Sequence, residues 1–331
     1  MGLGNSAGTL IDEPRTALPQ CTGAVLMVRP AACGYNPETA ATNKLQMPEP
    51  DPAAAQARAL AEFDAFVTAL RGEGIAVCVA EDTPTPVKPD ALFPNNWVSF
   101  HEDGTVVLYP MHAENRRAER RSEVLDAVAK SGFRISRVLD LTHHEGAGRF
   151  LEGTGSLLLD HASRVAYACI SPRTHALVAE EWGRELGYEM VLFEALDRNG
   201  VPFYHTNVMM SIGSRTAVLA SCAISRPHRE RLTAKLTASA HEVIEIDHAE
   251  IGQFAGNMLE LASWDEALGD CHLLVMSESA RRGLKPQTYT RLCAAVDGVL
   301  AVPVPTIERL GGGSVRCMLA EIFLPTAATE P

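Results

Sequence analysis

Cys317 is the residue in the sequence best suited to act as a nucleophile. It closely follows the glycine run of LGGGSVRCMLAEI, and consecutive glycines let the backbone take positive φ values and approach another group closely. A cysteine attacks as the thiolate, which forms when a base or a positive charge lies nearby. A cysteine next to Met318 and Leu319 is equally compatible with a core position, so the choice depends on the wider pattern.

His205 and Glu152 are the residues that could supply such a cysteine with an acid and a base. His205 lies in FYHTNVM, where the alternation of a strand would point it and Asn207 to the same face. Glu152 lies in the strand-like run FLEGTGSLLL, where a buried charge needs a partner such as a histidine or a cationic ligand. A lone histidine in an apolar strand is more often a core residue, but the polar neighbours of His205 favour a functional role.

Four asparagines fall in similar strand-like runs, although asparagine is disfavoured in strands. They are Asn95, Asn96, Asn207 and Asn257. Each amide offers a donor and an acceptor without charge, so together they could recognise a planar, amide-like group. Local turn chemistry explains Asn95 and Asn96 equally well, since both follow Pro94.

Five segments share one pattern, in which a polar or reactive residue follows an apolar start and precedes an apolar continuation. They are residues 93–100, 150–159, 203–212, 254–263 and 314–323. Successive segments lie about 50 to 60 residues apart, a spacing typical of repeat or propeller architectures. A second strand, a helix and a third strand follow each segment, and the N-terminal strand, helix and strand complete the fifth unit.

The repeat predicts an α/β fold of five ββαβ-type units about a pseudo-fivefold axis. The units form a single domain over residues 23–325, between a flexible N-terminal tail (1–22) and a C-terminal tail (326–331). In such a ring the first strands converge, which brings the candidate residues into one axial pocket. An ordinary pair of α/β domains is the alternative. Residues 31–50 are polar and long enough to form a lid over the site. The sequence does not say whether this lid closes on the site.

Composition argues against several classes of function. The 331 residues are 46% hydrophobic with a formal net charge of -12, which disfavours nucleic acids and anionic membranes as partners. No apolar run reaches the roughly 18 residues of a membrane span. No secretion signal is recognisable, and the eight cysteines form no CxxC pair, so we expect a cytoplasmic protein. Neither metal-ligand spacing nor a phosphate-binding glycine motif occurs, so we expect no catalytic metal and no cofactor.

The segments VLMVRP, FPNNW, LEGTG, ISPRT, YHTN and GGGSVRCM, in this order, resemble the pentein superfamily of guanidine-modifying enzymes. That superfamily includes arginine deiminases, dimethylarginine dimethylaminohydrolases and glycine amidinotransferases. The resemblance spans residues 23 to 325 and is strongest to the citrulline-hydrolase (citrullinase-like) branch, whose members read FPNNW. It implies a pentein propeller with Cys317 as nucleophile, His205 as general acid and base, and Glu152 positioning histidine and substrate. Arg173 would hold the substrate carboxylate in a bidentate pair, although an exposed position at a helix start is equally compatible.

Two departures from the superfamily pattern bear on the substrate. Arginine deiminases carry aspartates at the positions of Asn96 and Asn207, where they pair with the cationic guanidinium. Neutral amides would leave a buried guanidinium short of partners, whereas an uncharged ureido group needs both donors and acceptors. We therefore expect a hydrolase of non-peptide C–N bonds that converts citrulline to ornithine, ammonia and carbon dioxide.

Three other functions remain open at this stage. An amidinotransferase would pass the covalent group to an amine, and a deiminase or dimethylargininase would yield citrulline. A non-catalytic pentein-fold binding protein would carry an unreactive cysteine. The expected partner is a small amino-acid substrate, and the sequence leaves open whether the chain forms a homo-oligomer.

Overall fold

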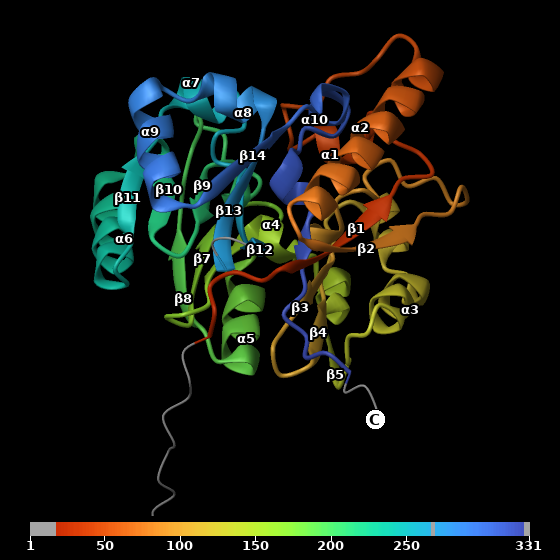
Figure 1. Ribbon diagram of the computed structural model, residues 1–331, viewed down its shortest axis with the longest axis horizontal. Coiled ribbons are helices and arrows are strands. Elements are labelled where there is room, and N and C mark those ends of the chain that lie inside the picture. Colours follow the sequence, from red (N-terminus) through yellow and green to blue (C-terminus); the bar gives the residue numbers. More distant parts are fainter. Residues whose placement is uncertain (1–17, 266–268, 328–331) are drawn as a thin grey trace, which may run out of the picture.

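Five three-stranded sheets make up the fold, and each has the same internal order. The computed structural model describes residues 18–265 and 269–327. In every sheet an antiparallel pair is extended by a third strand that runs parallel to the second (Figure 1). A parallel connection needs a crossover, and a helix supplies it in each unit.

The first three units follow one another directly along the chain. The first consists of β3 (Val98–Phe100), β4 (Thr105–Leu108), α3 (Ser122–Lys130) and β5 (Arg137–Asp140). The second consists of β6 (Leu157–Asp160), β7 (Val165–Cys169), α5 (Ala176–Leu186) and β8 (Glu189–Phe193). The third consists of β9 (Met210–Ile212), β10 (Thr216–Leu219), α6 (Arg226–Ala238) and β11 (Glu242–Glu245).

The remaining two units differ slightly in their connections. The fourth has two helices: β12 (Leu259–Asp265), β13 (Gly269–Ser277), α8 (Glu278–Gly283), α9 (Pro286–Ala295) and β14 (Gly298–Val302). The fifth joins the two ends of the described chain: β15 (Ala320–Glu321), β1 (Ala24–Arg29), α2 (Pro52–Gly72) and β2 (Ala76–Glu81). Short elements lie between them: α1 (Pro37–Ala40), α4 (Gly153–Ser156), α7 (His248–Ile251), α10 (Pro305–Gly311), η1 (Pro94–Asn96), η2 (Glu114–Glu119), η3 (Thr142–Ala147), η4 (Thr206–Val208), η5 (Ser221–Ala223) and η6 (Val315–Met318), where η marks a 3-10 helix.

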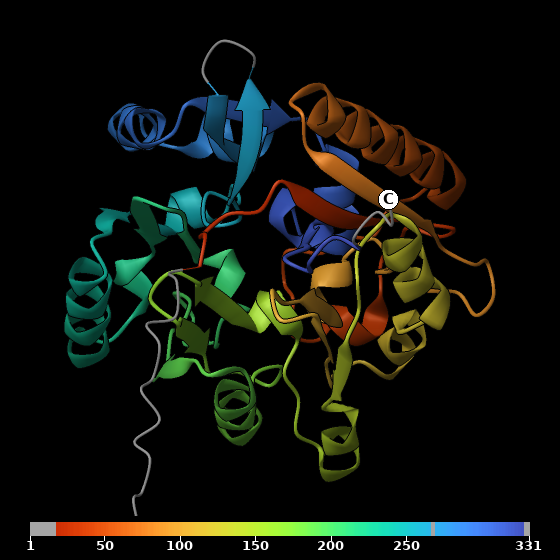
Figure 2. The same cartoon turned by 60° about the horizontal axis from the view of Figure 1, so that its bottom comes forward.

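The units stand in a ring with their helices outermost (Figure 2). Contacts between β15 and β3, α4 and η1, β6 and β9, β9 and β12, and β14 and α2 lead around it. The long helix α2 shows how a crossover helix is fixed. Asp51 caps its first turn by accepting from the Ala54 amide, and Phe63, Phe66 and Leu70 are buried beneath it. The predicted α/β fold of five ββαβ-type units about a pseudo-fivefold axis is confirmed.

One detail of the prediction is wrong. Most of the polar residues at the ring centre lie on short helical turns that precede the inner strands, since asparagine and glycine favour turns. Near the predicted tails, Cys21 is buried and Thr22 Oγ1 donates to the Ile322 carbonyl, while Thr326 bridges to Phe133. Residues 1–17 and 328–331, which hold the rest of the predicted tails, lie outside the described residues.

No helix in the described part of the chain combines the length and the apolar character that crossing a membrane would require.

Candidate active site

The short turns at the ring centre bring the predicted residues together from all parts of the chain. Asn96 lies on η1, His205 caps η4 and Cys317 lies on η6, and all three line one cavity with Arg173. Glu152, at the cap of α4, is wholly buried and bonded to His205. The remaining predicted residues are in contact with these: Asn95, Asn207 and Asn257.

The sulfur of Cys317 accepts hydrogen bonds from two asparagine amides. Asn257 Nδ2 lies 3.2 Å from Sγ, and Asn207 Nδ2 lies 3.5 Å away. Backbone groups fix the Asn257 amide, because its Nδ2 also donates to the Asn207 carbonyl and its Oδ1 accepts from the Arg316 amide. Two N–H groups aimed at a buried sulfur stabilise negative charge on it, which is what a nucleophilic thiolate requires.

His205 and Glu152 form a buried pair beside the cysteine. His205 Nε2 lies 2.8 Å from Glu152 Oε2, while Oε1 accepts from the His112 amide. Burial opposes ionisation of Glu152, but Arg173 and His205 outweigh it and hold the pKa of the carboxyl well below its usual range. Burial also lowers the pKa of His205 to about 4 despite the carboxylate. His205 is therefore a neutral imidazole at pH 7, able to accept a proton.

Asn96 has a partner that the sequence analysis missed. Arg116, on η2, donates from Nη1 to Asn96 Oδ1 at 2.7 Å, and its Nε and Nη2 pair with Glu119 at 2.9 Å each. Asn96 Nδ2 donates to Asn95 Oδ1 at 3.0 Å. Arg116 lies in the arginine-rich run AENRRAERR, which reads as an exposed helix, so nothing in the sequence distinguished it from its neighbours.

Arg173 does not present a free guanidinium. Its Nη2 donates to the Thr39 carbonyl and to Thr42 Oγ1, its Nε also donates to Thr42 Oγ1, and its Nη1 lies 3.4 Å from Glu152 Oε2. The predicted role in holding a substrate carboxylate would require replacing the two threonines. In this structure Arg173 instead links the segment above the site to the His205–Glu152 pair.

Residues 36–46, which we call the roof segment, cover the cavity and belong to the stretch predicted as a lid. Asn43 Nδ2 donates to the Gly311 and Gly312 carbonyls, and Gln46 Nε2 donates to the Gly311 carbonyl. These two glycines closely precede Cys317 in the chain. The open space beneath is about 20 Å³. A water needs about 10–15 Å³ by this measure, so the cavity in this structure is too small for an amino acid.

Gly155 lets two site residues approach the α4 turn. A Cβ atom on Gly155 would lie 2.6 Å from Asn96 Nδ2 and 2.8 Å from His205 Nδ1, closer than van der Waals contact allows. The same turn begins at Gly153, whose φ of +44° and proximity to the Asn95 carbonyl disfavour any side chain. The LEGTG motif is therefore required by close packing at the ring centre.

A family model identifies the family of this chain, and solved structures share its fold. The family model for eukaryotic N,N-dimethylarginine dimethylhydrolase matches residues 29–324. The N-terminal domain of ArgZ, an arginine dihydrolase from the ornithine–ammonia cycle in cyanobacteria, superposes in its substrate-bound form with a TM-score of 0.69 at 17% identity, over 91% of this chain and 99% of that one. Against whole ArgZ without ligand the TM-score is 0.71 at 16% identity, over 92% of this chain and 41% of that one.

A third solved structure is DDAH from Pseudomonas aeruginosa, a cysteine-to-serine variant complexed with citrulline. It superposes with a TM-score of 0.65 at 17% identity, over 92% of this chain and all of that one. At these identities the superpositions show a shared fold alone. None of the curated proteins matches the sequence.

The protonation of His205 can be followed directly. We expect its ring to stay neutral as the pH is lowered from 7 and to take up a proton only near pH 4, because burial outweighs the attraction of Glu152. Histidine-ring NMR over this range measures it, with a His205→Gln variant to assign the signal. Protonation near the ordinary value of about 6.5 would contradict the buried neutral pair.

Gly155→Ala is expected to lower kcat at least about 100-fold, because the methyl group displaces both His205 and Asn96 from reacting geometry. Steady-state kinetics measures it, and circular dichroism checks that the variant is folded. Gly146→Ala, in open space on a neighbouring turn, is the matched control and should retain activity. Wild-type kcat in a folded Gly155→Ala protein would show that this close approach is unimportant.

Proposed function

The chain belongs to the N,N-dimethylarginine dimethylhydrolase family, and on that premise we propose that it hydrolyses the ureido group of citrulline. Membership makes it a guanidino-modifying hydrolase that acts on carbon–nitrogen bonds. The proposal of citrulline rests on one observation, that Arg116 already occupies the acceptor oxygen of Asn96.

A guanidinium substrate fits poorly beside this arrangement. It brings only N–H donors and a positive charge, so it needs acceptors from the protein. Asn96 Oδ1 is engaged by Arg116, whose charge Glu119 balances, so this oxygen is not free to accept from a guanidinium. A neutral ureido group needs fewer acceptors, because its own oxygen is an acceptor.

A ureido group could also donate a hydrogen bond to the side-chain oxygen of Asn207. Asn207 Oδ1 is buried and has no hydrogen-bond partner among the described residues. An unpaired buried acceptor is costly, and the NH2 of a ureido group would satisfy it. The ureido oxygen would face the N–H groups that surround the Cys317 sulfur.

The proposed reaction uses Cys317 as nucleophile and His205 as proton carrier, because both line the same cavity. The Cys317 thiol loses its proton to His205, and the thiolate attacks the ureido carbon. Asn207 and Asn257 stabilise charge at the reacting centre, and His205 passes the proton to the departing nitrogen as the carbon–nitrogen bond breaks. Water then attacks the S-carbamoyl enzyme, His205 accepts its proton, and the thiolate leaves. The carbamic acid that is released breaks down to ammonia and carbon dioxide. The net reaction converts citrulline and water to ornithine, ammonia and carbon dioxide.

A second candidate is hydrolysis of arginine or a methylated arginine. The family is named for dimethylarginine, and ArgZ is described as an arginine dihydrolase. The Glu152 carboxylate favours this reading, since it could pair with a guanidinium if Arg173 moved away with the roof segment. We also propose a cytoplasmic location, supported by cysteines such as Cys33, Cys78 and Cys169 that are buried and form no disulfide.

Incubation of the purified protein with citrulline, arginine, dimethylarginine and agmatine, each analysed by mass spectrometry, tests the proposed reaction. We expect ornithine from citrulline, and we expect Cys317→Ser to reduce the rate at least about 10³-fold, because serine is a much weaker nucleophile. Cys222→Ser, at an exposed cysteine, is the control. Citrulline formed from arginine or dimethylarginine would establish the second candidate. Turnover of none of the substrates, with an unreactive Cys317, would refute both.

The role of Arg116 in selecting the substrate has its own test. The double variant Arg116→Met, Glu119→Gln removes the positive charge and frees Asn96 Oδ1 without leaving the buried partner charged. We expect the ratio of kcat/KM for citrulline to that for arginine to fall at least about 10-fold. Arg117→Met, at a partly exposed neighbour, should leave the ratio unchanged. An unchanged ratio in a folded double variant would contradict the argument from the occupied oxygen of Asn96.

A further inference from the structure

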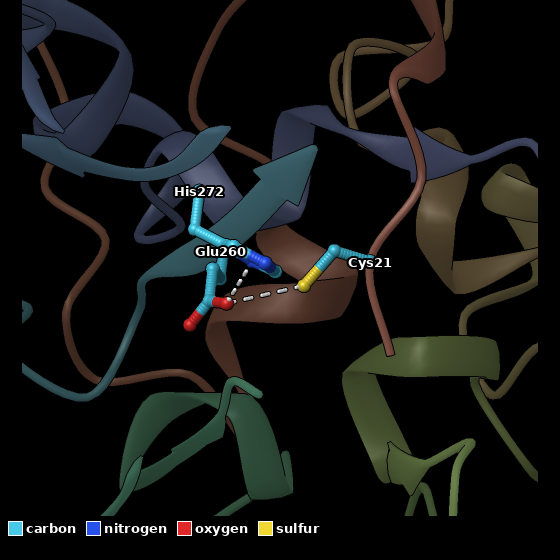
Figure 3. A group of neighbouring side chains, drawn as sticks. All are labelled: Cys21, Glu260 and His272. Carbon is cyan, nitrogen blue, oxygen red and sulfur yellow. Dashed lines mark hydrogen bonds and ion pairs between the residues drawn. The ribbon is translucent and has the colours of Figure 1, made fainter. Parts of the chain in front are cut away.

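We propose that Cys21, Glu260 and His272 form a binding site for a divalent cation of the Zn²⁺ class, separate from the cavity at Cys317. The three side chains point toward one another from different elements (Figure 3). Cys21 lies just before β1, Glu260 is on β12 and His272 is on β13. None of them lines the active-site cavity.

The distances between the three ligand atoms suit a single small cation. Cys21 Sγ lies 3.4 Å from Glu260 Oε1, and His272 Nδ1 lies 2.8 Å from the same oxygen. All three atoms lie within 4.8 Å of one another. A tetrahedral zinc with bonds of about 2.0–2.3 Å would hold such atoms roughly 3.3–3.8 Å apart, so side-chain movements of up to about 1 Å would be enough.

The backbone places these side chains before any metal is present. In the antiparallel pairing of β12 with β13, Glu260 faces Leu274 and Ala262 faces His272, so Glu260 and His272 are diagonal neighbours on one face. The segment that carries Cys21 is held against the same strand, because the Ala262 amide donates to the Thr22 carbonyl. A site held by two hydrogen-bonded strands needs little reorganisation to bind an ion.

The carboxylate is buried without a permanent positive charge beside it. Glu260 is 3% exposed, and among the described residues its one ion-pair partner is His272. Ser214 donates to it from both N and Oγ, which fixes its orientation as the outer partners of metal ligands do. Gly213 makes room for it, since a Cβ there would lie 2.1 Å from Glu260 Oε2. A bound cation would supply the missing charge.

The mixed ligand set and its access indicate the class of metal. A thiolate, an imidazole and a carboxylate together suit zinc and its neighbours better than calcium or magnesium, which prefer oxygen alone. The His272 side chain is 42% exposed, so an ion can enter from that side, and water can complete its coordination. Binding releases the Cys21 thiol proton to solvent, and the thiolate and the carboxylate then balance the two positive charges.

Without a metal the three residues form a hydrogen-bonded group in which the thiol donates to Glu260. Burial is the main cause that raises the pKa of the Cys21 thiol, and the charge of Glu260 adds to it. A metal must therefore displace a tightly held proton. A second group of possible ligands, His143, His144 and Glu181, has no thiol, and its exposed member His143 serves as a control.

The test uses the full chain carrying Cys317→Ser, so that no metal binds to the active-site thiol. After removal of metal by a chelator, ZnCl2 is titrated against a competing coloured chelator and CoCl2 is followed by absorption spectroscopy. We expect one equivalent of Zn²⁺ and a thiolate-to-cobalt charge-transfer band. Adding Cys21→Ser should abolish that band, and Cys21→Ser or His272→Gln should weaken Zn²⁺ binding at least about 10-fold. Cys222→Ser and His143→Gln should change neither.

The same titrations can overturn the proposal. No uptake of Zn²⁺ by the Cys317→Ser protein, or unchanged binding in folded Cys21→Ser and His272→Gln variants, would do so. Circular dichroism and the thermal midpoint, expected to rise on addition of Zn²⁺ only when Cys21 and His272 are intact, check folding. If Cys21→Ser does not fold, the partly exposed His272 keeps the test decisive. Because this protein lacks the catalytic thiol, the result is independent of the substrate.

Discussion

Glu152 carries a negative charge in a place that water does not reach, and the arrangement around it organises the candidate site. Its two oxygens accept from His205, Arg173 and the His112 amide, which come from three separate stretches of the chain. A buried carboxylate is tolerated only when such partners surround it. The ring satisfies this condition because α4 lies at its centre, in contact with both η1 and η4.

The ring brings together side chains that lie far apart in the sequence. Reactive side chains that lie far apart in sequence must meet within a few ångströms, and each must be held in one orientation. Here each unit contributes a short turn at the inner end of its sheet, and the outer helices bury the apolar face behind it. Backbone amides and carbonyls of these turns then orient the Asn257 and Glu152 side chains.

Much of the fold and of the candidate site could be predicted from the sequence, because the pattern of polar residues within apolar runs repeats in every unit. That repeat gave the fold, and it placed Cys317, His205, Glu152 and the asparagines near one axis. The local shape was not predictable in the same way, since period-two alternation does not reveal a single helical turn before a strand. Arg116 was missed because its burial depends on Glu119 and Asn96, and only tertiary structure joins them.

Two further features lay beyond the sequence for similar physical reasons. Arg173 was assigned to a substrate carboxylate, but its donors reach the roof segment, which is distant in sequence. No sequence motif links Cys21 to Glu260, and the two lie close together only because the N-terminal segment runs beside β12. Long-range packing decides what a short polar segment contacts.

The link between Arg173 and the roof segment couples access to reactivity. While the roof is down, Thr39 and Thr42 take up most of the Arg173 donors, and Glu152 is left to hold His205. If the roof segment lifted, those donors would lose their partners, so opening the cavity would also disturb the guanidinium that lies beside Glu152. The surroundings of the His205–Glu152 pair thus depend on a segment that is bonded to Arg173. Closing the cavity and completing the set of charges at its centre are therefore a single event, which favours chemistry only once bulk water is excluded.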